Sequence, residues 1–130
     1  MTRGTHVIYI VESDESVKQG LRRLVESAGL TARPCSCVKD FLRQAAEESA
    51  GCALLDIGCQ DLGEPGLRSQ LLGITAAVPF IALSTRDDAG TRRLARELGA
   101  RAFFRMPVDA AALLDSIDWL TQREARDKPH

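Results

Sequence analysis

One carboxylate, Asp56, stands at the end of a short apolar run and is the first candidate for chemistry in this sequence. The run Cys52–Leu55 follows Gly51 and precedes Ile57-Gly58, a pattern typical of a strand buried on both faces. A charged residue at the end of such a strand is expected at the rim of a sheet. In open α/β sheets, the rim at the carboxyl ends of the strands is where ligands bind and chemistry occurs.

Three other apolar segments end in residues that could face Asp56 across this rim. They are Val11-Glu12-Ser13-Asp14, Leu83-Ser84-Thr85 and Phe104-Arg105-Met106-Pro107. What these ends contain, and what they lack, decides which chemistry is open to the protein.

Strand and helix patterns alternate along the whole chain. Apolar and β-branched runs predict five strands, over residues 6–11, 30–35, 52–56, 78–83 and 102–104. Apolar residues at helical spacing predict helices over 14–29, 38–48, about 66–72, about 88–99 and 109–120. The charged residues 122–130 are expected to form a frayed tail.

This alternation predicts a single α/β domain over residues 1–121, with a parallel sheet covered on both faces. A flavodoxin-like, doubly wound (βα)5 sheet with strand order 2-1-3-4-5 fits best, because it places Asp56 beside the first strand at the switch point. Pro34 lacks a backbone N–H and therefore favours an edge position for the second strand.

The composition is that of a soluble globular domain, with 130 residues, 45% hydrophobic, 27% charged and a net charge of −1. This charge gives no electrostatic case for binding nucleic acid or an anionic membrane. The apolar stretch at the N-terminus is too short for a signal peptide, and no segment could span a bilayer. We therefore expect a cytoplasmic protein with reduced, buried or neutral thiols at its four cysteines, Cys35, Cys37, Cys52 and Cys59.

The sequence resembles the receiver domain of bacterial two-component response regulators, most closely the FixJ-like subgroup. The likeness is carried, in this order, by VESDESVKQGLRRLVESAGL, CALLDIG, VPFIALS and ELGARAFFRMPVDAAALLDSI, and covers roughly Thr5 to Leu120. It implies that Asp56 accepts a phosphoryl group from a histidine kinase or a small phosphodonor, by carboxylate attack that yields an acyl phosphate. The protein is therefore not expected to be an enzyme, beyond at most its own phosphorylation from a phosphodonor.

The resemblance also implies a Mg²⁺ ion that bridges carboxylate and phosphoryl oxygens. Its ligands would be Glu12, Asp56 and the backbone carbonyl of Gly58. Ser84 matches the family's residue that hydrogen-bonds the phosphoryl group, and Phe103 matches the aromatic switch that turns inward when the site is occupied.

Two positions depart from the family pattern. Ser13 replaces an acidic residue that binds Mg²⁺ directly, and the loss of a carboxylate weakens the attraction for a divalent ion. Met106, before Pro107, replaces the lysine that pairs with the phosphoryl group, and a thioether carries no charge. Arg86, on a loop at the same rim, could supply a substitute charge.

Three functions stay open at this point. The favoured one is an atypical receiver, or pseudo-receiver, with weak or absent phosphorylation and Mg²⁺ binding, that acts through protein contacts. The second is a functional phosphoacceptor receiver phosphorylated at Asp56 by a histidine kinase. The third is a small α/β enzyme or ligand-binding protein that shares only the fold, although the sequence shows no Gly-rich phosphate loop, catalytic triad or metal cluster.

Simpler structural roles are the alternative at each position. Asp56 could be an ordinary carboxylate at a strand end, Ser84 and Phe103 could cap and pack, and Met106 could fill the core.

The expected partners are a sensor histidine kinase or another signalling protein. Arginines between Thr91 and Arg105 precede Asp109, Asp115 and Asp118. This alternation of sign suits a homodimer formed through the fourth helix, fifth strand and fifth helix, with solvated charge as the alternative. We expect neither direct nucleic-acid binding nor membrane association.

Overall fold

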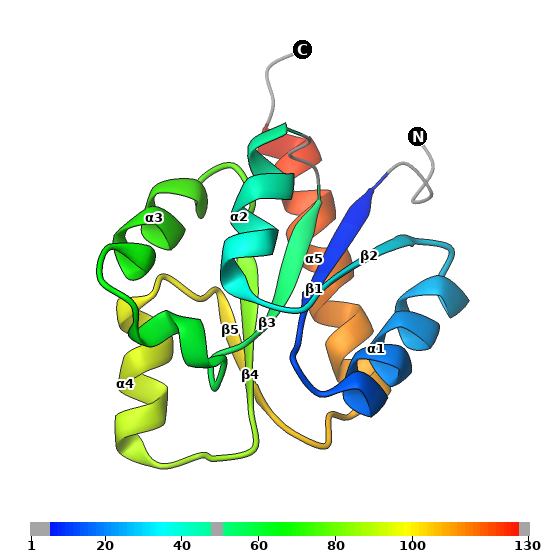
Figure 1. Cartoon of the computed structure of the whole chain (residues 1–130). Helices are drawn as coiled ribbons and strands as arrows, with labels where there is room; N and C mark the ends of the chain where they lie inside the picture. Colours follow the sequence, from blue (N-terminus) through cyan, green and yellow to red (C-terminus); the bar gives the residue numbers. More distant parts are fainter. Residues whose placement is uncertain (1–5, 48–50, 128–130) are drawn as a thin grey trace.

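A computed structural model describes residues 6–47 and 51–127 (Figure 1). Five parallel strands form one sheet in the order β2-β1-β3-β4-β5, which confirms the predicted flavodoxin-like topology and the edge position of β2. The strands are β1 (Val7–Val11), β2 (Thr31–Cys35), β3 (Cys52–Asp56), β4 (Phe80–Ser84) and β5 (Ala102–Arg105).

Helices cover both faces of the sheet, with α1 and α5 on one face and α2, α3 and α4 on the other (Figure 1). The helices are α1 (Glu15–Ser27), α2 (Val38–Glu47), α3 (Leu67–Ile74), α4 (Ala89–Glu97) and α5 (Ala110–Asp127). A short 3₁₀ helix, η2 (Gln60–Gly63), precedes α3. This 3₁₀ helix was not predicted from the sequence.

Aspartates begin three of the helices, as their sequence positions predict. The Asp14 carboxylate accepts a hydrogen bond from the Val17 amide at 3.0 Å, and Asp88 and Asp109 cap α4 and α5 in the same way. A side-chain oxygen at this position satisfies a backbone N–H that has no partner within the helix. Gly29 follows α1 with a φ of 81°, the left-handed conformation that ends helices.

The sheet separates two apolar layers, because successive side chains of a strand point to opposite faces. Tyr9 packs edge-on against Phe41 of α2, with ring centroids 5.2 Å apart. On the opposite face, Leu54 packs in the layer formed with α1 and α5. This burial on both faces fixes the sheet that carries Asp56.

The last helix is longer than predicted, because α5 continues beyond residue 120 to Asp127. Residues 122–127 are Gln, Arg, Glu, Ala, Arg and Asp, and most of these types favour helix even when exposed. Residues 128–130, the end of the predicted second helix at residue 48, and residues 1–5 lie outside the described part of the chain.

Truncation of a core side chain tests this architecture. Leu54 is fully buried, so Leu54→Ala is expected to lower the free energy of unfolding by about 3 kcal/mol, the lost transfer energy plus the cost of a cavity. Urea denaturation measures this loss. Leu72 is 47% exposed on α3, so Leu72→Ala is the control, and an equal loss in both variants would contradict the assigned core.

Candidate functional site

The strand ends predicted to meet do so at one rim of the sheet. Asp56 pairs in register with Leu83, the residue before Ser84, and Ser84 pairs with Arg105, the residue before Met106. On the other side of β3, Leu55 pairs with Val11, which precedes Glu12. The parallel register therefore brings Glu12, Asp56 and Ser84 to the same edge.

Asp56 is half-buried at the end of β3 and is held by the turn that follows it. Its Oδ1 atom accepts a hydrogen bond from the Gly58 amide at 2.8 Å, and its backbone carbonyl accepts one from Cys59 at 3.1 Å. A Cβ atom at Gly58 would lie only 3.1 Å from Asp56 Oδ1. Glycine at this position therefore lets the backbone approach the carboxylate closely.

Glu12 is buried beside Asp56, with 2% of its surface exposed. Its Oε2 atom accepts a hydrogen bond from the Asp14 amide at 3.0 Å, while Oε1 is buried with no N–H or O–H donor among the described residues. Glu12 and Asp56 can hydrogen-bond to each other only when one of the two carboxyl groups holds a proton. Burial, and then the neighbouring Asp56, raise the pKa of Glu12 from 4.5 to about 7.

Ser13, which replaces a carboxylate of the family pattern, is exposed on the solvent side of the rim. It borders a polar hollow of about 710 Å³ next to the Asp56 turn. The hollow is lined by Ser13, Ser36, Cys37, Gly58, Cys59, Gln60, Asp61 and Glu64. Water and ions can therefore reach the rim from this side.

Ser84 and Phe103, the two residues matched to the family's switch, contact arginine residues in this structure. Ser84 is buried, and its hydroxyl oxygen accepts a hydrogen bond from the Arg86 amide at 3.0 Å. Phe103 is half-buried, and the Arg92 guanidinium lies over its ring, 5.1 Å from the centroid. Asp87 in turn binds Arg92. Ser84 thus lies at the rim with Asp56, while Phe103 packs on the α4 side of the sheet.

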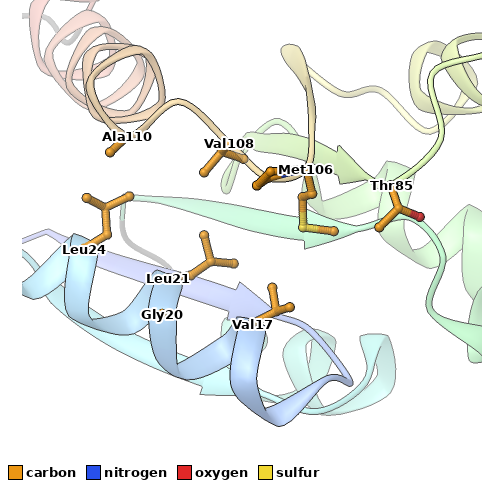
Figure 2. A pocket seen from close by; sticks show the side chains of 9 residues that line it. Val17, Gly20, Leu21, Leu24, Thr85, Met106, Val108 and Ala110 are labelled. Atoms are coloured by element: carbon orange, nitrogen blue, oxygen red, sulfur yellow. The ribbon is translucent and has the colours of Figure 1, made fainter.

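The two positions considered for a positive charge do not supply one to Asp56 in this conformation. The Arg86 guanidinium pairs with Asp88 at 3.1 Å and its side chain is 77% exposed, so the predicted substitute charge is engaged elsewhere. Met106 is half-buried and packs towards α1 (Figure 2). The peptide bond between Met106 and Pro107 is cis.

One cation that the sequence analysis missed is Lys18 on α1. Its side chain is 8% exposed, and its ammonium group donates to Ser36 Oγ at 2.9 Å and pairs with Glu15 at 3.2 Å. Lys18 lies three and seven residues before the buried Leu21 and Val25, so its spacing marks the inner face of the helix. This spacing in the sequence could have identified Lys18 as a residue on the buried face of α1.

The cysteines are free thiols, and three of them, Cys35, Cys52 and Cys59, are buried. Burial raises the pKa of Cys35 and Cys59 to about 12, so both are neutral thiols near pH 7. Within the described ranges, no three His, Cys, Asp or Glu side chains are grouped so as to hold a metal ion. No helix there is both long and apolar enough to cross a membrane.

A model of the response regulator receiver domain family matches residues 8–118. The chain belongs to this family. Receiver domains are modules of two-component signal transduction and are generally not enzymes. The topology and the aspartate at the end of β3 agree with this assignment.

Known response regulators are similar to the chain over most of its length. The response regulator protein TodT of Pseudomonas putida is 30% identical over 117 residues, which are 90% of this chain and 52% of TodT. The transcriptional regulatory protein FixJ of Azorhizobium caulinodans is 24% identical over 110 residues, or 85% of this chain and 52% of FixJ. The chain thus spans about half the length of these curated relatives.

A solved structure of a response regulator receiver protein is also similar to the chain. The response regulator receiver protein from Burkholderia phymatum has a TM-score of 0.72 and 27% sequence identity, covering 91% of this chain and 96% of that one.

The raised pKa of Glu12 predicts a stability that falls as pH rises. The group ionises near 4.5 in the unfolded chain but near 7 in the folded one, so the folded state loses stability between these values and carries the full penalty above about pH 7. Glu12→Gln mimics the protonated form. It is expected to raise the free energy of unfolding by up to roughly 3 kcal/mol at about pH 8, and by little near pH 4.5.

Urea denaturation across this pH range measures the difference between Glu12→Gln and the unaltered chain. Glu15→Gln is the matched control, because Glu15 is exposed and its pKa is lowered by Gln19 and Lys18. A gain from Glu12→Gln that does not depend on pH would show that Glu12 does not titrate as described.

Proposed function

We propose that this receiver domain is an atypical one, which signals through protein contacts with weak or absent phosphorylation of Asp56. The observation that carries the proposal is the absence of the expected cation from the rim. The lysine position holds Met106, whose side chain packs against the α1 side of the domain. A phosphoryl group on Asp56 would place its negative charge beside the carboxyl group of Glu12.

Electrostatics at the rim supports this proposal. Phosphoryl transfer to a carboxylate requires positive charge around the equatorial oxygens. Arg86, the basic side chain that could substitute for the missing lysine, pairs instead with Asp88. Without a compensating ion, a second or third negative charge at a half-buried site is strongly disfavoured.

Receiver domains bind Mg²⁺ at an acidic pocket, and the donor atoms of this chain fit that ion only in part. Asp56 supplies one carboxylate, the buried Glu12 Oε1 has no donor beside it, and Gly58 offers its carbonyl. Ser13 contributes a neutral hydroxyl where the family pattern has a carboxylate. When bound, the ion would offset negative charge between Asp56 and a phosphoryl group. We therefore propose that these residues hold Mg²⁺ weakly.

The second candidate is a functional phosphoacceptor receiver, modified at Asp56 by a histidine kinase. Its support is the position of Asp56 at a solvent-accessible rim, with the Gly58 amide on its Oδ1 and the Ser84 hydroxyl nearby in register. Under this function Arg86 would have to leave Asp88, which an exposed ion pair permits at little cost.

Amide NMR titrations with Mg²⁺ and then beryllofluoride, a phosphoryl mimic, separate the two candidates. We expect little shift at Asp56 and Ser84 at millimolar Mg²⁺. In the double variant Ser13→Asp, Met106→Lys, we expect Mg²⁺ affinity to rise roughly tenfold or more, because an added carboxylate beside a divalent cation contributes over about 1.4 kcal/mol. Beryllofluoride should then shift Asp56, Ser84 and Phe103.

Asp56→Asn in each background is the control, since it removes the acceptor without changing the fold. Saturating shifts in the unaltered chain at millimolar Mg²⁺, lost in Asp56→Asn, would overturn the atypical receiver and establish the second candidate.

We further propose that contacts are made with a histidine kinase or another signalling protein, and with a second copy through the α4-β5-α5 face. This face carries exposed Arg93, Arg96 and Arg101, with Asp115 exposed on α5. Trp119, 51% exposed, lines a hollow with Arg101 and Asp115. Tryptophan and arginine are the side chains that most often dominate binding energy at interfaces.

Sedimentation velocity tests the homodimer. Trp119→Ala is expected to raise the dimer dissociation constant roughly tenfold or more, the effect of losing an interface anchor. Leu72→Ala, which truncates the exposed leucine of α3, is the matched control and should leave the constant unchanged. A chain that stays monomeric at all concentrations, or a Trp119→Ala variant that dimerises normally, would contradict the proposed interface.

A further inference from the structure

The loop between β4 and α4 is fastened at both of its ends by polar contacts. At the rim, the Ser84 hydroxyl oxygen accepts a hydrogen bond from the Arg86 amide at 3.0 Å, and the Arg86 guanidinium pairs with Asp88 at 3.1 Å. Asp88 in turn caps α4, since its carboxylate accepts hydrogen bonds from the amide and the hydroxyl group of Thr91 at 2.8 and 3.0 Å. The start of α4 is therefore tied to the rim of the sheet.

The neighbouring carboxylate, Asp87, holds a side chain of α4 against β5. Two nitrogen atoms of Arg92, Nε and Nη2, donate to the two carboxylate oxygens of Asp87, the second of them at 3.2 Å. The same guanidinium lies over the ring of Phe103 in β5, with Cζ 5.1 Å from the ring centroid. Arg92 thus contacts an acidic residue of the loop and an aromatic residue of the edge strand at the same time.

This geometry distinguishes Arg92 from an ordinary solvated charge. Single ion pairs on a surface contribute little, whereas a bidentate arginine–carboxylate pair fixes the guanidinium in one orientation. A cation over an aromatic face is attracted to the ring, so a fixed Arg92 also favours the position of the ring beneath it. A lysine ammonium could not present two parallel donors to Asp87.

We propose that Asp87 and Arg92 form a latch that holds the Phe103 ring and the start of α4 in the arrangement of this structure. The parts of the latch lie on α4, on β5 and on the loop before α4, whereas Asp56 ends β3. The latch therefore acts whether or not Asp56 carries a phosphoryl group, and it goes beyond the proposed function.

The latch can be reached from solvent, so ions can open it. The side chains of Arg92 and Asp87 are 54% and 30% exposed, and salt screens the attraction between exposed charges. Opening removes the guanidinium from the Phe103 ring and releases α4 from β5. Because α4 and β5 belong to the face that we propose for protein contacts, the latch places that face under the control of ionic strength or of a competing carboxylate.

NMR of the intact chain tests the latch. The ring current shifts protons over an aromatic face upfield, so the Hδ signals of Arg92 are expected upfield of those of Arg93 at low salt. Arg92→Gln removes the guanidinium and keeps a residue that favours helix. It is expected to lower the ratio of the major to the minor χ1 rotamer of Phe103, read from three-bond couplings, roughly twofold to fivefold, the equivalent of one cation–π contact at an exposed site.

Asp87→Asn leaves Arg92 in place but removes the carboxylate that orients it. We expect smaller upfield shifts of the Arg92 signals and an intermediate rotamer ratio for Phe103. Raising the salt concentration from about 0.01 M to about 1 M should change the unaltered chain in the same direction. Arg93→Gln is the matched control, because Arg93 is an exposed arginine and the next residue of α4, and it should leave Phe103 unchanged.

Two results would overturn the latch. One is a rotamer ratio of Phe103 that Arg92→Gln leaves unchanged, or that Arg93→Gln lowers equally. The other is an effect of Arg92→Gln that disappears in an Asp56→Asn background, since Phe103 would then be governed from the rim. Equal effects in both backgrounds are the expected result.

Discussion

Two carboxyl groups, Glu12 and Asp56, meet at the end of the sheet, and the balance of charge around them governs the rest of the site. Burial makes ionisation of Glu12 costly, and the adjacent Asp56 raises the cost further. Arg86 does not offset it in this conformation, because its guanidinium pairs with Asp88. A proton on Glu12 or a cation from solution is then the available compensation. A cation that binds to these carboxylates at the rim competes with that proton.

The sheet that holds these groups could be predicted because a strand buried on both faces requires apolar residues along its whole length. Strands such as Cys52–Asp56 are nearly continuous apolar runs, and the helices α1, α4 and α5 begin at aspartates that cap them. Local features without a period were harder to predict. The four residues of η2 are too few to show a helical pattern. The end of α5 was underestimated, since charged residues suggested a tail although their types favour helix.

At the candidate site, the positions of the residues along the rim could be predicted from the sequence. The hydrogen-bond and ion-pair partners of their side chains could not. Parallel register brings Glu12, Asp56 and Ser84 to one edge whatever their neighbours are. The ion-pair partner of a long side chain depends on differences of a few ångströms in the positions of charged groups in loops. Arg86 therefore pairs with Asp88 rather than with the rim. Lys18, which the general preference of lysine for solvent would place outside, is instead buried against Ser36.

Met106 affects both the rim of the sheet and the packing beside α1 through a single departure from the family pattern. A thioether in place of an ammonium group removes a positive charge from the neighbourhood of Asp56. It also adds an apolar side chain to the surface beside α1. The same change therefore weakens the case for a phosphoryl group on Asp56. Ser13 borders the polar hollow, which Met106 does not line, so the two departures from the family pattern can be separated. A carboxylate added at Ser13 acts on cations at the rim, while an ammonium group added at Met106 acts on a phosphoryl group at Asp56.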